Sequence, residues 1–492
     1  MKRGDRISGS ARVSRAGDGV PAIADFLWGH GRREASSLRR DAATSTRDAR
    51  ATRLLVCALF ALTNVASAAT LQERINAAAP NETIEIEPGV HAGAIIINKP
   101  LRLVGQPGAE IRGNGVGNVV TITAANVTLR DLRISGSGLQ LANDNAAIHI
   151  TGNRATIENN VITDSLHGVY LKKVSDCRII GNQIRGKATL LAETKSIAQT
   201  LTAGVGELCE TALNQDQRGN GIHQWSCERN LISGNEISET RDGIYFSFTN
   251  HTRVENNRVH LVRYGLHYMY SDDNVFENNV FSENAAGAAV MFSHDLVIRG
   301  NHFIDNRGSR AYGILFQSDE RVRLENNVIR NNAVGLSFQQ AIAFVVRGND
   351  VSNNYIGLRF YGNSDDNSFS ENRFAENLHP IDVDGAGSNN RWAINGAGNF
   401  WSGADTLDLN GDGVNDLPHR ELDLFGPLRR DLPQIALLSG SPAVKLLRFA
   451  NERAAIPGLV SIEDPAPLTA KFWLIRAQRA LQAATSKKIS RK

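Results

Sequence analysis

Most of the chain alternates apolar and polar residues in short runs, and turn-forming residues separate the runs. A typical segment is Val322-Arg-Leu-Glu-Asn-Asn-Val-Ile329, in which two alternating stretches meet at a pair of asparagines. Alternation with a period of two predicts short β-strands, and Gly, Asn and Asp between the runs predict tight turns. A helical repeat would instead show a 3.6-residue period and strong helix formers. The pattern therefore predicts an all-β protein.

The strands recur in a register that a glycine marks. Each unit begins with glycine followed by an apolar residue, at Gly168, Gly221, Gly243, Gly265, Gly287, Gly313, Gly335 and Gly357. From Gly221 onward the spacings are 22, 22, 22, 26, 22 and 22 residues. An asparagine follows each glycine after fourteen residues, or fifteen in the last unit, at Asn182, Asn235, Asn257, Asn279, Asn301, Asn327, Asn349 and Asn372.

This register predicts a right-handed, single-stranded parallel β-helix of about 22-residue coils, because each coil buries its inward side chains only by stacking on its neighbours. The asparagines of one turn are expected to stack as a hydrogen-bonded ladder, about 4.8 Å apart. We expect the β-helix over residues 69–400, with a short amphipathic helix at Leu71 to Ala79 that caps its open N-terminal end.

The repeat is interrupted once and then fades. Between Asn182 and Gly221 the chain is 31 residues longer than one coil requires, which predicts a projecting loop. We expect residues 401–436 to form a terminal loop with an Asp-rich turn. Residues 437–492 are expected to form a C-terminal tail, with a terminal helix at about Lys471 to Gln482.

The N-terminal part of the chain carries an export signal behind an atypical segment. Arg53 precedes an apolar run, Leu54 to Leu62, and the run ends in Ala66-Ser-Ala68. This is the pattern of a signal peptide at residues 53–68 with cleavage after Ala68, and the run is too short to span a membrane. A buried apolar strand or helix is the alternative. Residues 1–52 are either a real extension or the product of a start site assigned too far upstream.

The exported chain would carry three cysteines, and export permits a disulfide. Cys209 lies in the projecting loop and Cys227 in the next coil, so we favour a disulfide between these two, with Cys177 left free. Three buried, small apolar side chains are the alternative.

Composition and charge narrow the function. The formal net charge of the 492 residues is only +3, and 21% are charged. A nucleic-acid-binding protein would need a basic face to neutralise phosphates, so this class is not expected.

Side chains two and four residues after each repeat glycine are expected to point outward, because the residues one and three after it are mostly apolar. The first outward column is Tyr170, His223, Tyr245, His267, Ala289, Leu315, Ser337 and Arg359. The second is Lys172, Trp225, Ser247, Met269, Met291, Gln317, Gln339 and Tyr361.

Two methionines, 22 residues apart, give the second column its candidate chemistry. Met269 and Met291 should lie directly over one another, with His267 on the same strand and His294 at the following turn. Thioethers flanked by imidazoles form a soft ligand set that favours Cu(I) over Mg²⁺, Ca²⁺ or Mn²⁺. The alternative is that the methionines pack under a loop or against a partner. On the same face, His223 and Trp225 are expected to be binding-surface residues.

A second candidate metal site is Asp408-Leu-Asn-Gly-Asp-Gly-Val-Asn-Asp416. Oxygen ligands at positions 1, 3, 5 and 9, which are Asp408, Asn410, Asp412 and Asp416, match most of a calcium loop. Position 12 is His419 instead of the bidentate glutamate. The choice between a weak Ca²⁺ site and a plain polar turn stays open.

The enzyme alternative is a glycan-active β-helix, which needs a pair of carboxylates or a carboxylate-held Ca²⁺ on its outer face. Neither outward column contains Asp or Glu. The nearest acids, Asp272 with Asp273 and Asp365 with Asp366, follow the strands and are typical of turns.

Several strings resemble the NosD family, the periplasmic maturation proteins of nitrous oxide reductase, within the wider class of carbohydrate-binding and sugar-hydrolase-type β-helices. The resemblance covers about residues 70–460. The strings that carry it are Leu103-Val-Gly-Gln-Pro-Gly-Ala-Glu-Ile111, Gly168-Val-Tyr-Leu171, Tyr264-Gly-Leu-His-Tyr-Met-Tyr-Ser271, Val290-Met-Phe-Ser293, and Asn399-Phe-Trp-Ser402 with the loop from Asp408 to Asp416.

The resemblance implies a periplasmic accessory protein that is not an enzyme. It implies partnership with an ABC transporter (an ATPase and a permease), with a small copper chaperone and with apo nitrous oxide reductase, and membrane association through the permease. Our hypothesis is that Met269 and Met291, with His267 and His294, receive Cu(I) transiently and pass it on. A carbohydrate-binding or carbohydrate-active β-helix and a metal-free β-helical scaffold are the alternatives.

Overall fold

The structure is a computed structural model that describes residues 69–187, 218–307, 311–361, 363–384, 389–404, 407–421, 438, 441–453 and 462–472. The chain divides into two units, Met1–Ser67 and Ala68–Lys492, and the described residues belong to the second. The extension at 1–52, the signal peptide at 53–68, Cys209 with most of its predicted loop, and most of the predicted helix at Lys471 to Gln482 lie outside the described residues.

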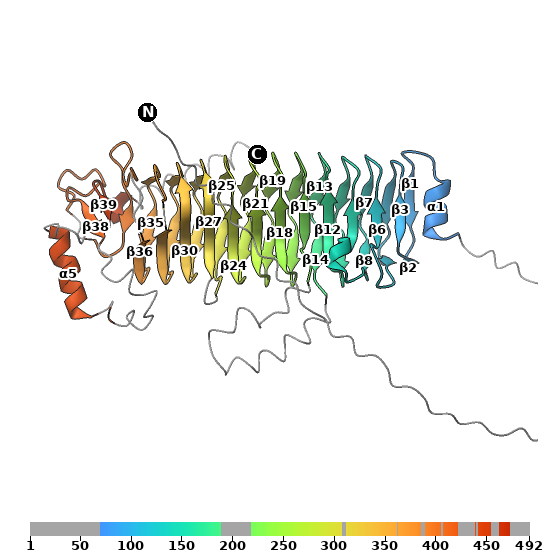
Figure 1. Cartoon of the computed structure of the whole chain (residues 1–492), viewed down its shortest axis with the longest axis horizontal. Helices are drawn as coiled ribbons and strands as arrows, with labels where there is room; N and C mark the ends of the chain where they lie inside the picture. The colour runs from blue at the N-terminus through green and yellow to red at the C-terminus, as the bar shows by residue number, and fades with distance from the viewer. Residues whose placement is uncertain are drawn as a thin grey trace, which may run out of the picture. The chain divides into compact units, whose positions relative to one another are not determined.

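Three parallel sheets run side by side along the described part of the chain (Figure 1). Sheet A has 12 described strands: β1 (Thr83–Ile86), β4 (Arg102–Gly105), β7 (Thr128–Arg130), β10 (Thr156–Glu158), β13 (Arg178–Ile180), β16 (Leu231–Ser233), β19 (Arg253–Glu255), β22 (Val275–Glu277), β25 (Val297–Arg299), β28 (Arg323–Glu325), β31 (Val345–Arg347) and β34 (Ser368–Ser370).

Sheets B and C follow the same order. Sheet B has 13 described strands: β2 (Gly89–Ala92), β5 (Ala109–Arg112), β8 (Arg133–Ser135), β11 (Val161–Thr163), β14 (Gln183–Arg185), β17 (Glu236–Ser238), β20 (Arg258–His260), β23 (Val280–Ser282), β26 (His302–Ile304), β29 (Val328–Arg330), β32 (Asp350–Ser352), β35 (Arg373–Ala375) and β37 (Phe400–Trp401). Sheet C has 12: β3 (Ile95–Ile97), β6 (Val120–Ile122), β9 (Ala146–Ile150), β12 (His167–Lys172), β15 (Ile222–Trp225), β18 (Asp242–Ser247), β21 (Tyr264–Met269), β24 (Ala286–Met291), β27 (Tyr312–Glu320), β30 (Val334–Ile342), β33 (Ile356–Tyr361) and β36 (His379–Asp384).

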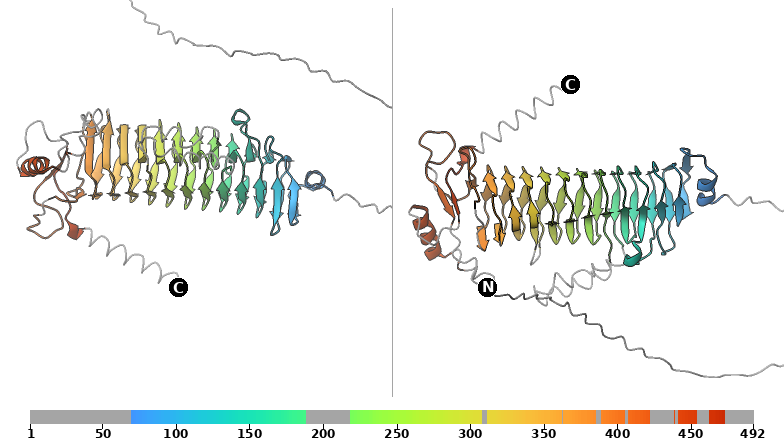
Figure 2. Two further views of the ribbon diagram at one scale, coloured as in Figure 1. Left: turned by 90° about the horizontal axis from the view of Figure 1, so that it is seen from below. Right: turned by 45° about the horizontal axis from the view of Figure 1, so that its top comes forward.

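Each coil adds one strand to each sheet, so that a strand pairs with the strand three places further along the chain. In sheet A, β10 pairs with β13 in parallel, with Thr156 opposite Arg178. The two views of Figure 2 show the same succession of coils from other sides. The predicted all-β parallel β-helix is therefore confirmed.

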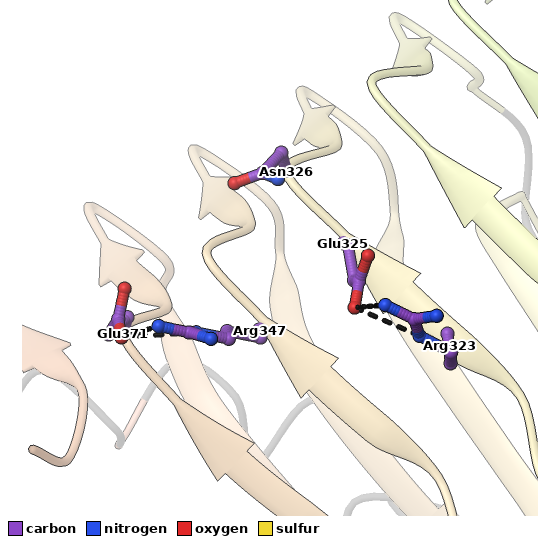
Figure 3. Close-up of a pocket in the computed structure, with 5 residues that line it drawn as sticks. All are labelled: Arg323, Glu325, Asn326, Arg347 and Glu371. Atoms are coloured by element: carbon purple, nitrogen blue, oxygen red, sulfur yellow. Dashed lines mark hydrogen bonds and ion pairs between the residues drawn. The ribbon is translucent and has the colours of Figure 1, made fainter. Parts of the chain in front are cut away.

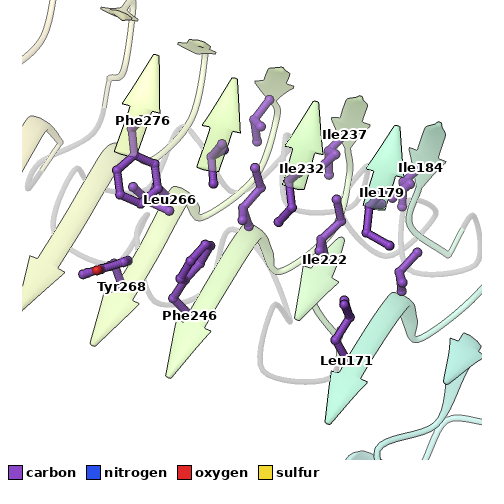
Figure 4. Close-up of a cluster of buried hydrophobic side chains, with 14 of the residues drawn as sticks. Leu171, Ile179, Ile184, Ile222, Ile232, Ile237, Phe246, Leu266, Tyr268 and Phe276 are labelled. Atoms are coloured by element: carbon purple, nitrogen blue, oxygen red, sulfur yellow. The ribbon is translucent and has the colours of Figure 1, made fainter. Parts of the chain in front are cut away.

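The core lies between the three sheets and is built from one apolar column per strand. Ile157, Ile179 and Ile232 stack in sheet A and are fully buried. Figure 4 shows how side chains from all three sheets, such as Leu171, Ile179 and Ile184, point into this core. Burial of such columns is the main stabilising contribution, because each inward side chain is covered only by neighbouring coils.

The predicted asparagine ladder is present at the turn between sheets A and B. The side-chain oxygen of Asn279 accepts from the backbone N–H of Asn257 (3.0 Å) and from its Nδ2 (2.9 Å). Nδ2 of Asn279 in turn donates to Asn301 Oδ1 and to Val254 O, both at 2.9 Å. These asparagines are almost fully buried, so the ladder satisfies backbone groups that the tight turn leaves without a partner.

The repeat glycine has a steric cause. A Cβ on Gly265 would lie 2.6 Å from the carbonyl oxygen of Gly287 and 2.7 Å from the ring of Phe281. A side chain does not fit at this corner of the coil, which explains why the glycine recurs.

Different structures close the two ends of the stack. Helix α1 (Leu71–Ala77) covers the N-terminal end with Leu71 and Ile75, and Thr70 and Glu73 form its capping box. At the other end the asparagine ladder finishes at Asn399, whose backbone N–H and Nδ2 donate to Asp464 Oδ2. Asp464 ends β39 (Ile462–Asp464), which pairs antiparallel with β38 (His419–Glu421).

Two further helical elements complete the description. A short 3-10 helix, η1 (Leu141–Asn143), lies between β8 and β9, and α5 (Pro442–Arg453) contacts β38. In the described part of the chain, the helices fall short of the length and apolar character that crossing a membrane requires.

Candidate functional site

The candidate site lies on the outward face of sheet C. In the second outward column, Lys172, Trp225, Ser247, Met269 and Met291 are consecutive Cα partners on five neighbouring strands. From Trp225 onward the 22-residue coil places them side by side, whereas Lys172 precedes Trp225 by 53 residues, since the predicted projecting loop falls between their coils.

The first outward column is less exposed than the alternation predicts. Tyr170, Ala289 and Ser337 are 5%, 1% and 0% exposed, so the expectation that the whole column faces solvent is wrong at these positions. Neighbouring rings cover Tyr170, and the side chains of Ala289 and Ser337 are too short to rise above their neighbours.

Five aromatic rings, His149, Tyr170, His223, Tyr245 and His267, follow one another in this column. Neighbouring ring centroids lie 5.4, 4.3, 4.4 and 4.9 Å apart. We call this set the imidazole–phenol ladder. It ends at His267, two residues before Met269 on β21, so that its last imidazole lies on the same face as the two thioethers.

His267 is held by a carboxylate from the preceding coil. Its Nδ1 lies 2.8 Å from Oδ2 of Asp242, and Arg263 donates to both oxygens of that carboxylate. Burial by itself raises the pKa of Asp242, but His267 and Arg263 together hold it at about 2. The carboxylate lies against Nδ1 of His267, so Nε2 is the ring nitrogen of His267 that could take a metal ion. This is how metal-binding histidines are oriented.

His223 of the ladder and His167, whose ring contacts that of His223 edge-on, have the opposite arrangement. Asn220 donates its backbone N–H to Nδ1 of His167 (2.9 Å), and its Nδ2 lies 3.0 Å from Nδ1 of His223. Burial lowers the pKa of His167 to about 4 and that of His223 well below its usual range, so both rings are neutral. An Nδ1 that accepts leaves the proton on Nε2. These two rings therefore offer an N–H at Nε2.

The structure brings the predicted methionine pair together. Met269 on β21 and Met291 on β24 are direct Cα partners, and both side chains are half-buried on the outward face. Two thioethers one coil apart can approach the same soft ion.

His294 lies at the turn beyond Met291 and is exposed. Its Nδ1 is 2.8 Å from Asp295 Oδ2, and its Nε2 is 3.3 Å from Asp272 Oδ2. Both ring nitrogens thus face carboxylates, and binding a metal would require His294 to release one of them.

Trp225 packs under two cations. Nζ of Lys172 and of Lys173 lie 5.6 and 5.2 Å from its ring centroid, a cation–π arrangement. Trp225 and His223 are neighbours on β15 and are both half-buried. They stay predicted binding-surface residues.

The Asp-rich turn is closed by its own hydrogen bonds. Asp408 accepts from the backbone N–H of Asp412 and of Gly413, both at 3.0 Å, and Asp416 accepts from that of Leu409 (2.7 Å). Asn410 also accepts from Asp412 (2.9 Å).

The twelfth position does not complete a calcium site. His419 is 7% exposed and stacks on Trp401, with ring centroids 4.9 Å apart. The donor atoms Asp408, Asn410, Asp412 and Asp416 suit Ca²⁺, but the bidentate ligand at position 12 is replaced by a buried ring.

The two described cysteines, Cys177 and Cys227, are buried inside the stack. Sγ of Cys227 lies 3.5 Å from Leu171 O, and burial raises the pKa of this thiol. Burial also raises the pKa of Cys177, to about 11. Cys209 lies outside the described residues, so the proposed pairing with Cys227 stays a prediction.

A shallow surface depression on sheet A is not a suitable site for a metal ion (Figure 3). Arg323, Glu325, Asn326, Arg347 and Glu371 line it, and its charges pair with one another as Arg323 with Glu325 and Arg347 with Glu371. Across the described ranges, no group of three or more His, Cys, Asp or Glu side chains is placed to hold a metal ion. Thioether sulfurs fall outside that set of residues.

Sequence reasoning missed Asp242. Neither predicted outward column contains an acid, but Asp242 lies just before the repeat glycine and still reaches the outer face. It is 1% exposed and contacts His267 of the next coil. A signal was available: residues directly before the repeat glycine include His167, Asn220, Asp242 and Tyr264, which are all polar or aromatic.

Fold and face together define a parallel β-helix protein that presents imidazoles and thioethers from consecutive coils. A family model described as "Periplasmic copper-binding protein (NosD)" matches residues 206–406. A "Probable ABC transporter binding protein NosD" from Pseudomonas aeruginosa is 31% identical over 396 residues, which are 77% of this chain and 86% of the relative. One from Stutzerimonas stutzeri is 29% identical over 397 residues, 77% of this chain and 85% of that relative.

The chain therefore belongs to the NosD family, which is described as periplasmic and copper-binding. The two relatives are named as ABC transporter binding proteins and not as enzymes. Among solved structures, the A-module of the mannuronan C-5 epimerase AlgE6 from Azotobacter vinelandii aligns with a TM-score of 0.45 and 13% identity over 68% of this chain and 94% of the module.

Proposed function

We propose that this protein is a periplasmic accessory factor that receives Cu(I) transiently and passes it toward apo nitrous oxide reductase. It works with an ABC transporter and a small copper chaperone. The observation that carries the proposal is the direct pairing of Met269 with Met291 beside His267, whose Nδ1 lies against Asp242.

The ligand types suit transfer. Thioethers and a neutral imidazole favour Cu(I) among the biologically available metal ions. Two or three such ligands on an outer face hold the ion more weakly than a closed thiolate site, and weak, exposed binding is what a delivery step requires. Copper is therefore the cargo of this site and not a resident cofactor.

His267 is the better imidazole ligand of the two that the sequence suggested. Asp242 lies against Nδ1 of its ring and leaves Nε2 to take the ion, whereas both nitrogens of His294 face Asp272 and Asp295. We assign His294 a second, conditional role, in which it joins the ion only after leaving one carboxylate.

A carbohydrate-active site is the less suitable interpretation of the outward face of sheet C. A glycosidase needs two carboxylates that act as acid and base or nucleophile. Asp242 is fully engaged with Arg263 and His267 and is almost completely buried.

The C-terminal segment, residues 437–492, is the proposed docking segment for the permease, through which the protein would be associated with the membrane. Three side chains of α5 support this role: Leu446, Leu447 and Phe449 are 67%, 40% and 49% exposed. Transporter motion would reposition the β-helix relative to its partners.

The experiment that tests the proposal measures copper in the reductase. Cells carrying Met269→Ile with Met291→Ile should make a stable protein but a copper-deficient reductase, since isoleucine fits a strand and offers no thioether. Gln317→Leu is the matched control, because Gln317 is the Cα partner of Met291 on the next coil. A fully loaded reductase in the double variant would contradict the site assignment.

A further inference from the structure

Three large aromatic side chains are exposed at one turn, directly after the second outward column. Phe248, Tyr270 and Phe292 are 53%, 47% and 41% exposed. Their rings stack, with centroids 5.4 and 5.0 Å apart and planes within 10° of parallel. We call these three residues the aromatic ridge.

The ridge occupies an unfavourable backbone conformation. Phe248, Tyr270 and Phe292 have φ of +52°, +49° and +54°, a left-handed region that large side chains rarely adopt. On the flanking coils Ser226 and Ser318 hold the same turn with φ of +53° and +58°. The turn itself therefore does not require aromatic residues.

The ridge coincides with the proposed copper site. Each of its residues follows a residue of the second column, so that Tyr270 comes directly after Met269 and Phe292 directly after Met291. The three coils with an exposed ring are thus the two coils that carry the thioethers and the one before them. Because the exposed rings are confined to these coils, we relate them to the same step as the copper ligands, which is the receipt of Cu(I).

An acidic row borders the ridge. Asp272 and Asp273 follow Tyr270 by two and three residues, Asp295 follows Phe292 by three, and Glu320 follows Ser318 of the next coil by two. Their side chains are 27%, 50%, 39% and 52% exposed, in that order. Arg321 is the formal positive charge in this row and pairs with Asp295 and Glu320. Four carboxylates against one arginine leave the row negative.

We infer that the aromatic ridge is the docking surface for the protein that brings Cu(I) to Met269 and Met291. Its partner surface would be an apolar patch bordered by Lys and Arg side chains. The inference rests on the proposed function and adds to it the place and the chemistry of the donor contact. Exposed aromatics and methionines are typical of interface centres, and opposite charge around them speeds encounter.

The geometry favours a protein over the other occupants of such a surface. Phe248 and Phe292 cover both faces of Tyr270, so mainly ring edges meet the solvent, whereas a sugar would need a ring face. An anionic membrane surface would be repelled by the acidic row. A ridge three coils long also suits a small, transient contact, as a delivery step requires.

The test uses the full chain and the Cu(I)-loaded copper chaperone. The variant is Phe248→Ser with Tyr270→Ser and Phe292→Ser, since serine already holds this turn in the flanking coils. The matched control is Leu261→Ser, which removes an apolar side chain that is 48% exposed and also has a positive φ of +56°. Association is measured by surface interferometry, copper transfer by stopped-flow, and the chain's own Cu(I) affinity against a competing chromophore.

We expect the triple variant to weaken association about tenfold or more and to slow transfer, with unchanged Cu(I) affinity of the chain alone and no effect of Leu261→Ser. Added salt should weaken wild-type association. Unchanged association of the triple variant with the chaperone would overturn the inference. So would a triple variant that loses binding to oligosaccharides or lipid vesicles instead of binding to the chaperone. If the chain alone takes no copper but the triple variant still loses the chaperone, the docking surface stands and the copper site fails.

Discussion

At the residue scale, hydrogen-bond partners distinguish the histidines at and beside the ladder. His167 and His223 accept at Nδ1 from Asn220, whereas His267 faces Asp242. The sequence predicted which side chains share the outer face, because their spacing follows the coil. It could not predict these partners, since they depend on how the chain bends at the repeat glycine.

The buried neutral ring of His167 predicts a pH dependence of stability. Burial holds its pKa at about 4 in the folded protein, against about 6.5 in an unfolded chain. The unfolded state therefore takes up a proton first, and stability should fall as the pH drops from about 6.5 to 4, by about 3 kcal/mol in all. Thermal unfolding against pH measures this.

His167→Gln should make that slope shallower, because a glutamine oxygen can still accept from Asn220 but does not titrate, and the slope that remains comes from His223, whose pKa burial also lowers. His251→Gln, at a ring that is 52% exposed, should leave the slope as it is. An unchanged slope in His167→Gln would show that other groups cause it.

Asp242 predicts a second residue-scale effect, on copper. Asp242→Asn should weaken Cu(I) binding by about tenfold, because the ring of His267 loses the charged partner that fixes its orientation. Competition with a Cu(I) chromophore gives the change. Asp176→Asn is the control, because Asp176 forms an exposed pair with Arg229. Equal Cu(I) affinities of the two variants would show that Asp242 does not position His267.

At the element scale, the glycine and asparagine register predicted the coils and the asparagine ladder correctly. It did so because both features depend on stacking alone: the glycine avoids a clash at the coil corner, and each asparagine bonds to the next coil. The ends of the stack follow no repeat. The closing contact of Asn399 with Asp464 joins residues 65 positions apart, and the sequence held no periodic signal for it.

The ladder predicts a large and local stability effect. Asn279→Ala removes four hydrogen bonds to Asn257, Asn301 and Val254 and leaves buried polar groups without partners, so it should destabilise the fold by about 3 kcal/mol. Urea unfolding measures the change. Asn256→Gly is the control, because Gly234 and Gly300 hold the equivalent turn in other coils. A change below that of the control would mean that the ladder contributes little.

The Asp-rich turn predicts weak calcium binding at most. With the position-12 ligand replaced by His419, we expect a dissociation constant of about 1 mM or weaker, and Asp408→Asn with Asp412→Asn should abolish the titration signal in calorimetry. Micromolar binding would mean that a ligand from elsewhere in the chain completes the site.

At the scale of the whole molecule, a rigid stack of coils carries one face that combines soft ligands, oriented imidazoles and an exposed aromatic ridge. The sequence predicted the methionine pair and its direction. It did not reveal the roles of Asp242 and the aromatic ridge, because these roles depend on which neighbouring side chains cover them in the fold. The family is described as copper-binding, and the paired thioethers are the place that we propose for the ion.

The most direct test of this account is a Cu(I) titration of the purified full chain against a competing chromophore, beside the Met269→Ile, Met291→Ile variant and the Gln317→Leu control. The account predicts that the wild type and the control take up copper and that the double variant does not. Equal copper uptake by all three proteins, or none by the wild type, would contradict the assignment of Met269 and Met291 as the site that receives copper.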